Sequence, residues 1–288
     1  MPPEFLVVGH VVQDLLSDTG KWRLGGAASY ASALARNLGL RAAVLTAASP
    51  GLPLAKLLPG VECRVVPSDA TTQMRNIYSP GSKRQQFVPQ RAARLSAAHL
   101  PAAWRDSRIV LLGPVAGEID ASLASCFPRS LVGAGAQGWL REIGSDSHVR
   151  PVHPADWPAG PVLHAARALF LSDEDLPPED APAALAEWSG MIDIVAFTRG
   201  YDGADVCRHG EWRRIAAFPA SPVDLTGAGD VFATAFLVRL SETDEAWEAA
   251  RFASCAASFV IEAEGILGVP DRAQIEARLR AHPEIVAS

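Results

Sequence analysis

The segment Asp224–Asp230 (Asp-Leu-Thr-Gly-Ala-Gly-Asp) combines three small residues with a closing carboxylate, directly before a segment of helical character. Gly227, Ala228 and Gly229 leave backbone N–H groups open to close approach by an anion. The helix that follows points its positive dipole end and its unpaired N–H groups at the same place. Asp230 stands beside this anion site and could take a proton from an attacking hydroxyl. The pattern therefore indicates transfer of a phosphoryl group.

The same segment also has a plain structural interpretation, as a glycine turn before a helix with an acidic first turn. The Gly-x-x-x-x-Gly-Lys-Ser/Thr phosphate motif does not occur. One Gly-x-Gly-x-x-Gly match, Gly133–Gly138, follows a predicted strand. The segment after it, Trp139–Gly144, is too short for the helix that a dinucleotide site requires. An NAD-binding oxidoreductase is an alternative that rests on this match alone.

Bulk properties exclude several other classes. The 288 residues carry a formal net charge of −6, which argues against a general binder of nucleic acid or of anionic membranes. The four cysteines form no CxxC pair, so neither a zinc site nor a redox dithiol is indicated. The N-terminal residues show no signal-peptide pattern, and the longest apolar stretch, Phe252–Ile261, is too short to span a bilayer. We therefore expect a cytoplasmic protein.

Short apolar strands alternate with helices along most of the chain. Phe5–Gly9 reads as a buried strand, Ala27–Leu38 as a helix and Arg41–Ala48 as the next strand. Further strands are predicted at 108–112, 130–132, 168–171 and 192–197, with a helix at 181–188. This order predicts an α/β fold with a mostly parallel sheet covered on both faces. Beyond Gly227 the pattern is nearly all helical, over 231–240, 244–264 and 272–281.

Two segments, at about 11–24 and 71–88, break this alternation. Both alternate polar and apolar residues and contain turn signals, and Ser79–Ser82 separates the two halves of a predicted hairpin. Together they predict a small accessory sheet that forms a lid over the edge of the main sheet. Because no linker or composition shift divides the chain, we expect residues 1–288 to form a single domain.

Two further motifs accompany the Asp224–Asp230 segment. Gly25 and Gly26 open a helix in the N-terminal half, and Thr198–Gly203 (Thr-Arg-Gly-Tyr-Asp-Gly) follows a predicted strand. In their order and separations the three motifs resemble the signatures of the ribokinase-like (PfkB-type) carbohydrate kinases. Those signatures are a Gly-Gly substrate motif, a Thr-x-Gly-x-x-Gly nucleotide loop and Asp-Thr-x-Gly-Ala-Gly-Asp before a helix. The resemblance covers nearly the whole chain.

This resemblance implies a three-layer α/β/α fold with a mostly parallel central sheet and a β lid that closes over the substrate. It also implies two sets of contacts. The nucleotide set is Thr198, Arg199, Gly200, Gly203 and Thr226. The set for the acceptor substrate is Asp14, Gly25, Gly26, Asn76, Gln137 and Arg141. The last two follow a strand end, where open α/β sheets place ligand contacts.

The chain departs from the family pattern at three places. Where the family has Asn-x-x-Glu, this chain has Ser172-Asp-Glu-Asp175, so Asp175 would help to hold hydrated Mg²⁺. Leu225 replaces the usual Thr, which argues against activation by a monovalent cation bound at the same loop. Tyr30 stands where many sugar kinases carry Asn, and the Gly-Gly-Ala-Ala-Ser-aromatic form is more similar to the branch that contains myo-inositol kinases.

The resulting hypothesis is an ATP- and Mg²⁺-dependent kinase that phosphorylates a hydroxyl of a sugar, inositol or related polyol. Asp230 would be the base and the backbone at Gly227–Gly229 the anion hole. Because the helix dipole favours a charged Asp230, we expect a weak base. The alternatives are a nucleoside kinase of the same fold and a non-catalytic regulator that binds sugar or nucleotide. The lid edge could pair with a second copy and give a homodimer.

Overall fold

The centre of the computed structural model is a nine-stranded sheet in the order β15-β14-β13-β12-β9-β8-β1-β4-β5. The structure describes residues 1–16, 20–77 and 85–288. From β5 to β13 neighbouring strands run parallel, and β14 and β15 continue the sheet as an antiparallel hairpin. The strands are β1 (Phe5–Val8), β4 (Ala42–Ala48), β5 (Glu62–Pro67), β8 (Ile109–Leu112), β9 (Leu131–Gly135), β12 (Ala168–Ser172), β13 (Ile194–Thr198), β14 (Ala204–Arg208) and β15 (Glu211–Ile215).

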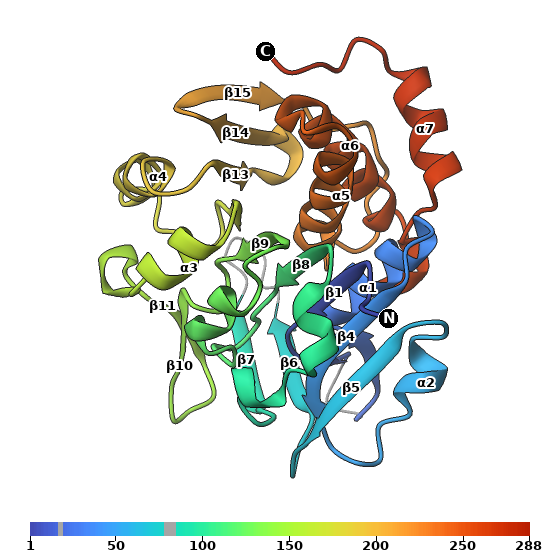
Figure 1. Cartoon of the computed structure of the whole chain (residues 1–288), viewed down its shortest axis with the longest axis vertical. Helices are drawn as coiled ribbons and strands as arrows, with labels where there is room; N and C mark the ends of the chain where they lie inside the picture. The colour runs from blue at the N-terminus through green and yellow to red at the C-terminus, as the bar shows by residue number, and fades with distance from the viewer. Residues whose placement is uncertain (17–19, 78–84) are drawn as a thin grey trace.

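Helices cover both faces of this sheet (Figure 1). In β1 the side chains of Phe5 and Val7 pack into one core and those of Leu6 and Val8 into the other. The first face carries α1 (Ala27–Asn37), α2 (Leu54–Leu57), α5 (Ala228–Thr243), α6 (Ala246–Val260) and α7 (Arg272–Ala281). The second carries α3 (Gly160–Ala165), α4 (Ala181–Ser189), η1 (Ala97–His99), η2 (Ala102–Asp106), η3 (Ala121–Cys126) and η4 (Pro154–Asp156). Burial on both faces explains why the central strands are apolar throughout.

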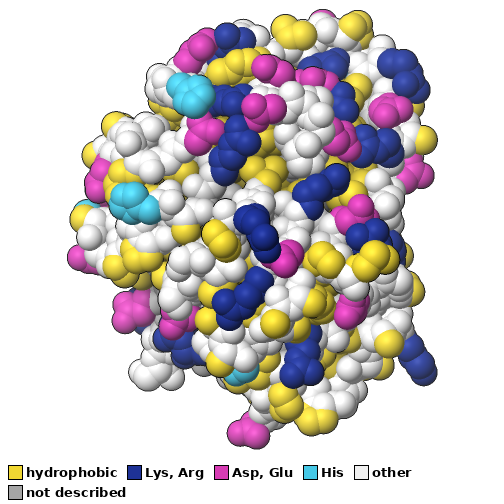
Figure 2. All heavy atoms as spheres, viewed as in Figure 1, with side chains coloured by type: hydrophobic (Ala, Val, Ile, Leu, Met, Phe, Trp, Pro, Cys, Tyr) yellow, Lys and Arg dark blue, Asp and Glu magenta, His cyan; other side chains and the backbone are white. Residues whose placement is uncertain are grey.

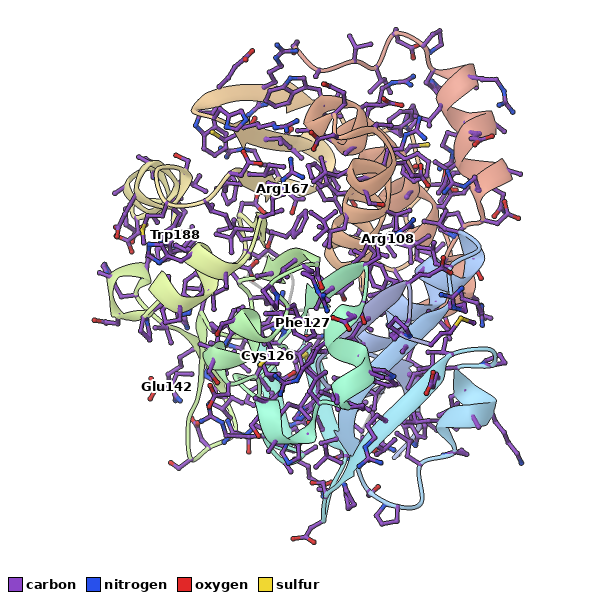
Figure 3. The ribbon with its side chains drawn as sticks, viewed as in Figure 1. Arg108, Cys126, Phe127, Glu142, Arg167 and Trp188 are labelled. Atoms are coloured by element: carbon purple, nitrogen blue, oxygen red, sulfur yellow. The ribbon has the colours of Figure 1, made fainter. Side chains whose placement is uncertain are left out.

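The second core contains an aromatic cluster under α4. Figure 3 labels Trp188, a buried residue of α4. Its ring meets Trp157 edge to face at 5.3 Å between centroids, and Trp157 stacks on Trp139 at 5.7 Å. Edge-to-face and offset-stacked arrangements are the favourable geometries for aromatic rings. The cluster therefore anchors the loops that follow β9 against the layer of α3 and α4.

A separate four-stranded sheet, in the order β3-β2-β6-β7, lies at the sites predicted for the lid. Its strands are β2 (Val12–Leu15), β3 (Trp22–Gly25), β6 (Thr72–Ile77) and β7 (Gln85–Gln90). β2 pairs antiparallel with β3 and parallel with β6. The predicted turn at 79–82 lies outside the described residues. Beside β7 lies a two-stranded hairpin of β10 (Arg141–Ile143) and β11 (Val149–Pro151), joined to it by a bridge between Phe87 and His148.

The structure confirms one sequence-based expectation and differs from two others. β9 runs directly into a turn and then into β10, so no helix follows Gly133–Gly138, as the short segment Trp139–Gly144 predicted, and the NAD-binding alternative fails. The β14–β15 hairpin was not predicted, because its charged residues do not form an apolar run. The helix predicted over 244–264 starts only at Ala246, since Asp244 ends α5 in the left-handed conformation (φ 55°).

On the face in Figure 2, basic and acidic side chains are interspersed. Within the described residues, no helix is both long and apolar enough to cross a membrane.

The ring of Phe236 anchors α5 on the sheet, so we expect Phe236→Ala to lower the free energy of unfolding by about 3–5 kcal/mol. The side chain is fully buried and meets Phe170 of β12 edge to face at 5.4 Å between centroids. Urea unfolding would measure the change. The control is Leu267→Ala, because Leu267 is 87% exposed and should shift stability by less than about 0.5 kcal/mol. A loss below about 1 kcal/mol for Phe236→Ala would contradict this packing.

Candidate active site

A cleft of about 350 Å³ lies between the lid, the strand ends of the main sheet and the N-terminus of α5. In an open α/β sheet the carboxyl ends of the strands are the usual place for a ligand. The cleft brings together residues from distant parts of the chain. Those predicted from sequence that line it are Asp14, Gly26, Asn76, Gln137, Arg141, Asp175, Thr198, Gly200, Gly203, Thr226, Gly227, Ala228, Gly229 and Asp230.

Two of the predicted site residues do not line the cleft. The guanidinium of Arg199 pairs with Asp205 at 2.6 Å and covers the ring of Phe197, so its side chain points to neighbouring protein. Gly25 lies behind Asp14, and a Cβ at this position would overlap the Asp14 carboxylate. Gly25 therefore leaves room for an acidic side chain rather than contacting a ligand.

The loop before α5 presents its backbone to the cleft. Gly227 is the N-cap of α5 and has φ 84°, in the left-handed region that glycine adopts without strain. A Cβ there would overlap the ring of Tyr30 from α1. Among the described residues no backbone carbonyl accepts from the N–H of Gly227 or Gly229, and Ala228 has only a 3.4 Å contact with the Leu225 carbonyl. These N–H groups are available to an anion.

Asp230 occupies the third helical position of α5, on the wall of the cleft. Burial raises the pKa of its carboxyl to about 7; Arg141 lowers it, while Asp14 and Asp175 raise it. The sequence-based expectation of a weak base is therefore wrong, because loss of solvent outweighs the helix dipole. A carboxylate with a pKa near neutrality is well matched to general-base catalysis.

The lid side of the cleft is lined by hydrogen-bonding groups. The Gln86 side-chain amide donates to Asn76 Oδ1 at 2.9 Å, and Arg141 Nη1 donates to the Val115 carbonyl at 3.1 Å. Asp14 is 7% exposed. The Tyr30 hydroxyl is buried with no partner among the described residues, and burial, reinforced by Asp14, raises its pKa. These groups suit a ligand with many hydroxyls.

Carboxylates dominate the charge of the cleft. Its acidic lining residues are Asp14, Asp173, Glu174, Asp175 and Asp230, and among the described residues Arg141 is the one basic side chain that lines it. Asp175 Oδ2 accepts from the N–H of Ser172 at 2.8 Å and from its hydroxyl at 3.0 Å. Partial loss of solvent and the adjacent Glu174 raise the pKa of Asp173. The described residues contain no ready-made cluster of three or more acidic, His or Cys ligands for a metal.

The opposite side of the cleft is apolar and was not predicted. It is formed by residues after β15, on α6 and at its C-cap, namely Ala217, Phe218, Ala220, Ala257 and Ile261, with Ser254 and Ser258 beside them. None of these belongs to a recognisable motif, and apolar residues on a helix read as ordinary core. One signal in the sequence could have indicated this surface, namely that the residues of α6 that line the cleft are small.

Comparison with known proteins identifies the class. The model of the pfkB family of carbohydrate kinases matches residues 165–271. The ribokinase of Bacillus subtilis (strain 168) is 40% identical over 225 residues, which cover 72% of this chain and 76% of that protein. The chain belongs to the pfkB family and is a carbohydrate kinase, a phosphotransferase with an alcohol group as acceptor. The sequence-based predictions of family and enzyme class are confirmed.

One further relative and one solved structure are also similar to this chain. Inositol 3-kinase of Zea mays is 29% identical over 280 residues, covering 89% of this chain and 73% of that protein. A solved pyrophosphate-dependent kinase in the ribokinase family, complexed with a pyrophosphate analog and myo-inositol, superposes with a TM-score of 0.79 at 22% identity. The match covers 95% of this chain and 99% of that one. The predicted ribokinase-like α/β fold is thereby confirmed.

The contact between Gly227 and Tyr30 predicts the effect of adding one methyl group. We expect Gly227→Ala to lower the free energy of unfolding by at least about 2 kcal/mol, because Ala would be strained at φ 84° and would overlap the ring. The matched control is Gly229→Ala, two residues on, where a Cβ meets nothing within 4 Å. Thermal unfolding of both variants measures the difference, and equal melting temperatures would contradict the contact.

Proposed function

We propose that this chain is an ATP-dependent kinase that transfers the γ-phosphoryl group to a hydroxyl of a sugar, inositol or related polyol. The observation that carries the proposal is the position of Asp230. Its carboxyl, with a pKa of about 7, lies in the same cleft as the free backbone N–H groups at the start of α5. Asp230 accepts the proton of the attacking hydroxyl while those N–H groups stabilise the transferred phosphoryl oxygens. The whole chain acts as one kinase domain with a lid.

The apolar side of the cleft supports ATP as donor rather than pyrophosphate. Phe218, Ala257 and Ile261 offer a surface for a flat, weakly polar group such as adenine, next to the Thr198–Gly203 loop. Pyrophosphate has no apolar part to bury there, and a site for it would need several basic side chains. Arg141 is the one basic side chain found in the described lining.

The acidic lining fits Mg²⁺ as part of the donor. Five carboxylates would repel bare phosphates, and oxygen ligands are those that Mg²⁺ prefers. Asp173 and Asp175 would hold the ion through its bound waters, since the described residues do not supply a full coordination shell. When bound, Mg²⁺ neutralises the charge of the phosphates and holds them in position.

The polar side of the cleft supports a polyol as acceptor. Asp14, Asn76 and Arg141 can bind several adjacent hydroxyls, and the buried Tyr30 hydroxyl supplies a further donor or acceptor. The similarity to an inositol 3-kinase makes inositol the first acceptor to test. Val12, Met74 and Val115 also line the lid side, and this apolar surface is the observation that favours a nucleoside as the alternative acceptor.

The test is release of ADP from ATP and Mg²⁺ with a panel of inositols, sugars and nucleosides. We expect turnover with a polyol, and Asp230→Asn should lower its kcat by roughly 10²–10⁴-fold, because the base is lost. Asp69→Asn is the control, since Asp69 is exposed, outside the cleft lining and outside the three motifs. Tight binding of ligand without turnover would favour the regulator, and a folded Asp230→Asn variant with full kcat would sink the role of Asp230.

The pKa of Asp230 predicts the pH profile. Below about pH 7 the carboxyl is protonated and cannot accept a proton, so kcat/KM should rise between about pH 6 and 8. The positive charge of Arg141 lowers this pKa, so Arg141→Met should move the rising limb to higher pH. Arg91→Met, which removes a charge that does not act on Asp230, should leave the limb in place. If the rising limb of kcat/KM stays near pH 7 in Arg141→Met, the limb does not report the ionisation of Asp230.

A further inference from the structure

Arg23 joins the lid to the loop before α5. Its Nη2 lies 2.8 Å from Oδ2 of Asp224, and the two side chains are 27% and 11% exposed. An ion pair shielded in this way is stronger than one on the open surface. Arg23 does not line the cleft, whereas Thr226 and Gly227, just beyond Asp224, do. The ion pair with Asp224 therefore gives Arg23 a direct route to the backbone that lines the cleft.

Asp224 connects three segments of the chain. Its Oδ1 accepts from the N–H of Thr226 at 3.1 Å and from the Thr226 hydroxyl at 2.7 Å. Its Oδ2 accepts from Arg23 on the lid and from the N–H of Gly265 at 3.4 Å, at the start of η6 (Gly265–Gly268). Strand β3 packs directly on η6. The carboxylate thus fixes the first residues of the loop whose backbone continues into Gly227.

Arg23 also has a defined place beside the acceptor side of the cleft. In the antiparallel pair of β2 and β3 it stands directly opposite Asp14, so both side chains lie on the same face of the lid sheet. Asp14 lines the cleft, and Gly25, two residues after Arg23, packs on its carboxylate. One strand pair therefore carries both an acceptor-side carboxylate and the cation that binds Asp224.

We infer that Arg23 is a positioning residue for phosphoryl transfer and that it acts through Asp224. The guanidinium holds the Asp224 carboxylate, which orients the Thr226–Gly229 backbone towards the phosphoryl group. The loop 224–229 therefore has its active conformation only when β3 of the lid is in position. The expected effect on turnover rests on the proposed function, whereas the expected effect of Arg23 on the conformation of the loop does not. A displacement of about 1 Å in such a site can cost on the order of 10²-fold in rate.

The kinetic test is Arg23→Ala, which should lower kcat about 10–100-fold while the KM of the acceptor changes less than about threefold. The control is Lys21→Ala on the same lid, whose side chain is exposed and outside the cleft lining. Arg23→Lys, which keeps the charge, should recover part of the loss, as should millimolar guanidinium added to Arg23→Ala. Loss of kcat with no recovery by either route would overturn the inference.

A double-mutant cycle shows whether the effect passes through Asp224. In an Asp224→Asn background, Arg23→Ala should cost no more than about twofold in kcat, because its partner charge is already gone. If the two losses multiply independently, Arg23 does not act through Asp224 and the inference fails. Circular dichroism and thermal unfolding confirm that each variant is folded, and the conservative Arg23→Lys variant keeps the test valid if Arg23→Ala does not fold.

A readout without substrate separates this inference from the proposed function. Hydrogen exchange of the unliganded protein should show that Arg23→Ala raises the exchange rate of amides in 224–229, including the Thr226 N–H, while Lys21→Ala does not. Faster exchange in a protein that turns over no acceptor would support the Arg23 contact and sink the proposed activity. Unchanged exchange in an active enzyme would overturn the Arg23 inference alone.

Discussion

The contact between the Tyr30 ring and the backbone of Gly227 determines how the two halves of the site meet. α1 brings Tyr30 to the cleft and α5 brings the open backbone N–H groups at its N-terminus, and these two helices pack against each other. Because the ring touches a residue that has no side chain, the helices approach closely enough for Asp230 to lie in the same cleft as Asp14. Because the interior is close-packed, the distance between these two helices also fixes the positions of the side chains that they carry.

Electrostatics then divides the cleft into regions with different tasks. The acidic strand ends suit a metal-bound phosphate chain, the apolar residues of α6 suit a flat ring, and the lid supplies hydrogen bonds. Asp230 lies where these regions meet, and its environment makes it a stronger base than an exposed aspartate. Arg141 limits that effect by lowering the pKa, so the carboxyl still loses its proton near neutral pH.

Much of the fold was predictable, because apolar strands, glycine caps and the three motifs are local signals. The parallel sheet, the lid segments and the presence of α5 follow from such patterns, although α5 begins at Ala228 rather than at the predicted residue 231. The β14–β15 hairpin was missed because an edge hairpin with charged residues lacks an apolar run. The pKa of Asp230 was misjudged because desolvation depends on what surrounds the carboxyl in space. The place of Arg199, turned towards Asp205, depends in the same way on a neighbouring strand.

The packing of Gly25 on Asp14 has a consequence for how this protein can diverge. Position 25 cannot gain a side chain while position 14 keeps its carboxylate in place, since the two would overlap. Position 25 can therefore change only after position 14 has lost its carboxylate, because a side chain gained first at position 25 would displace that carboxylate. A lineage that abandons the acidic contact is then free to fill position 25, and one that retains the contact inherits the glycine as well. Natural variation at the two positions should be correlated.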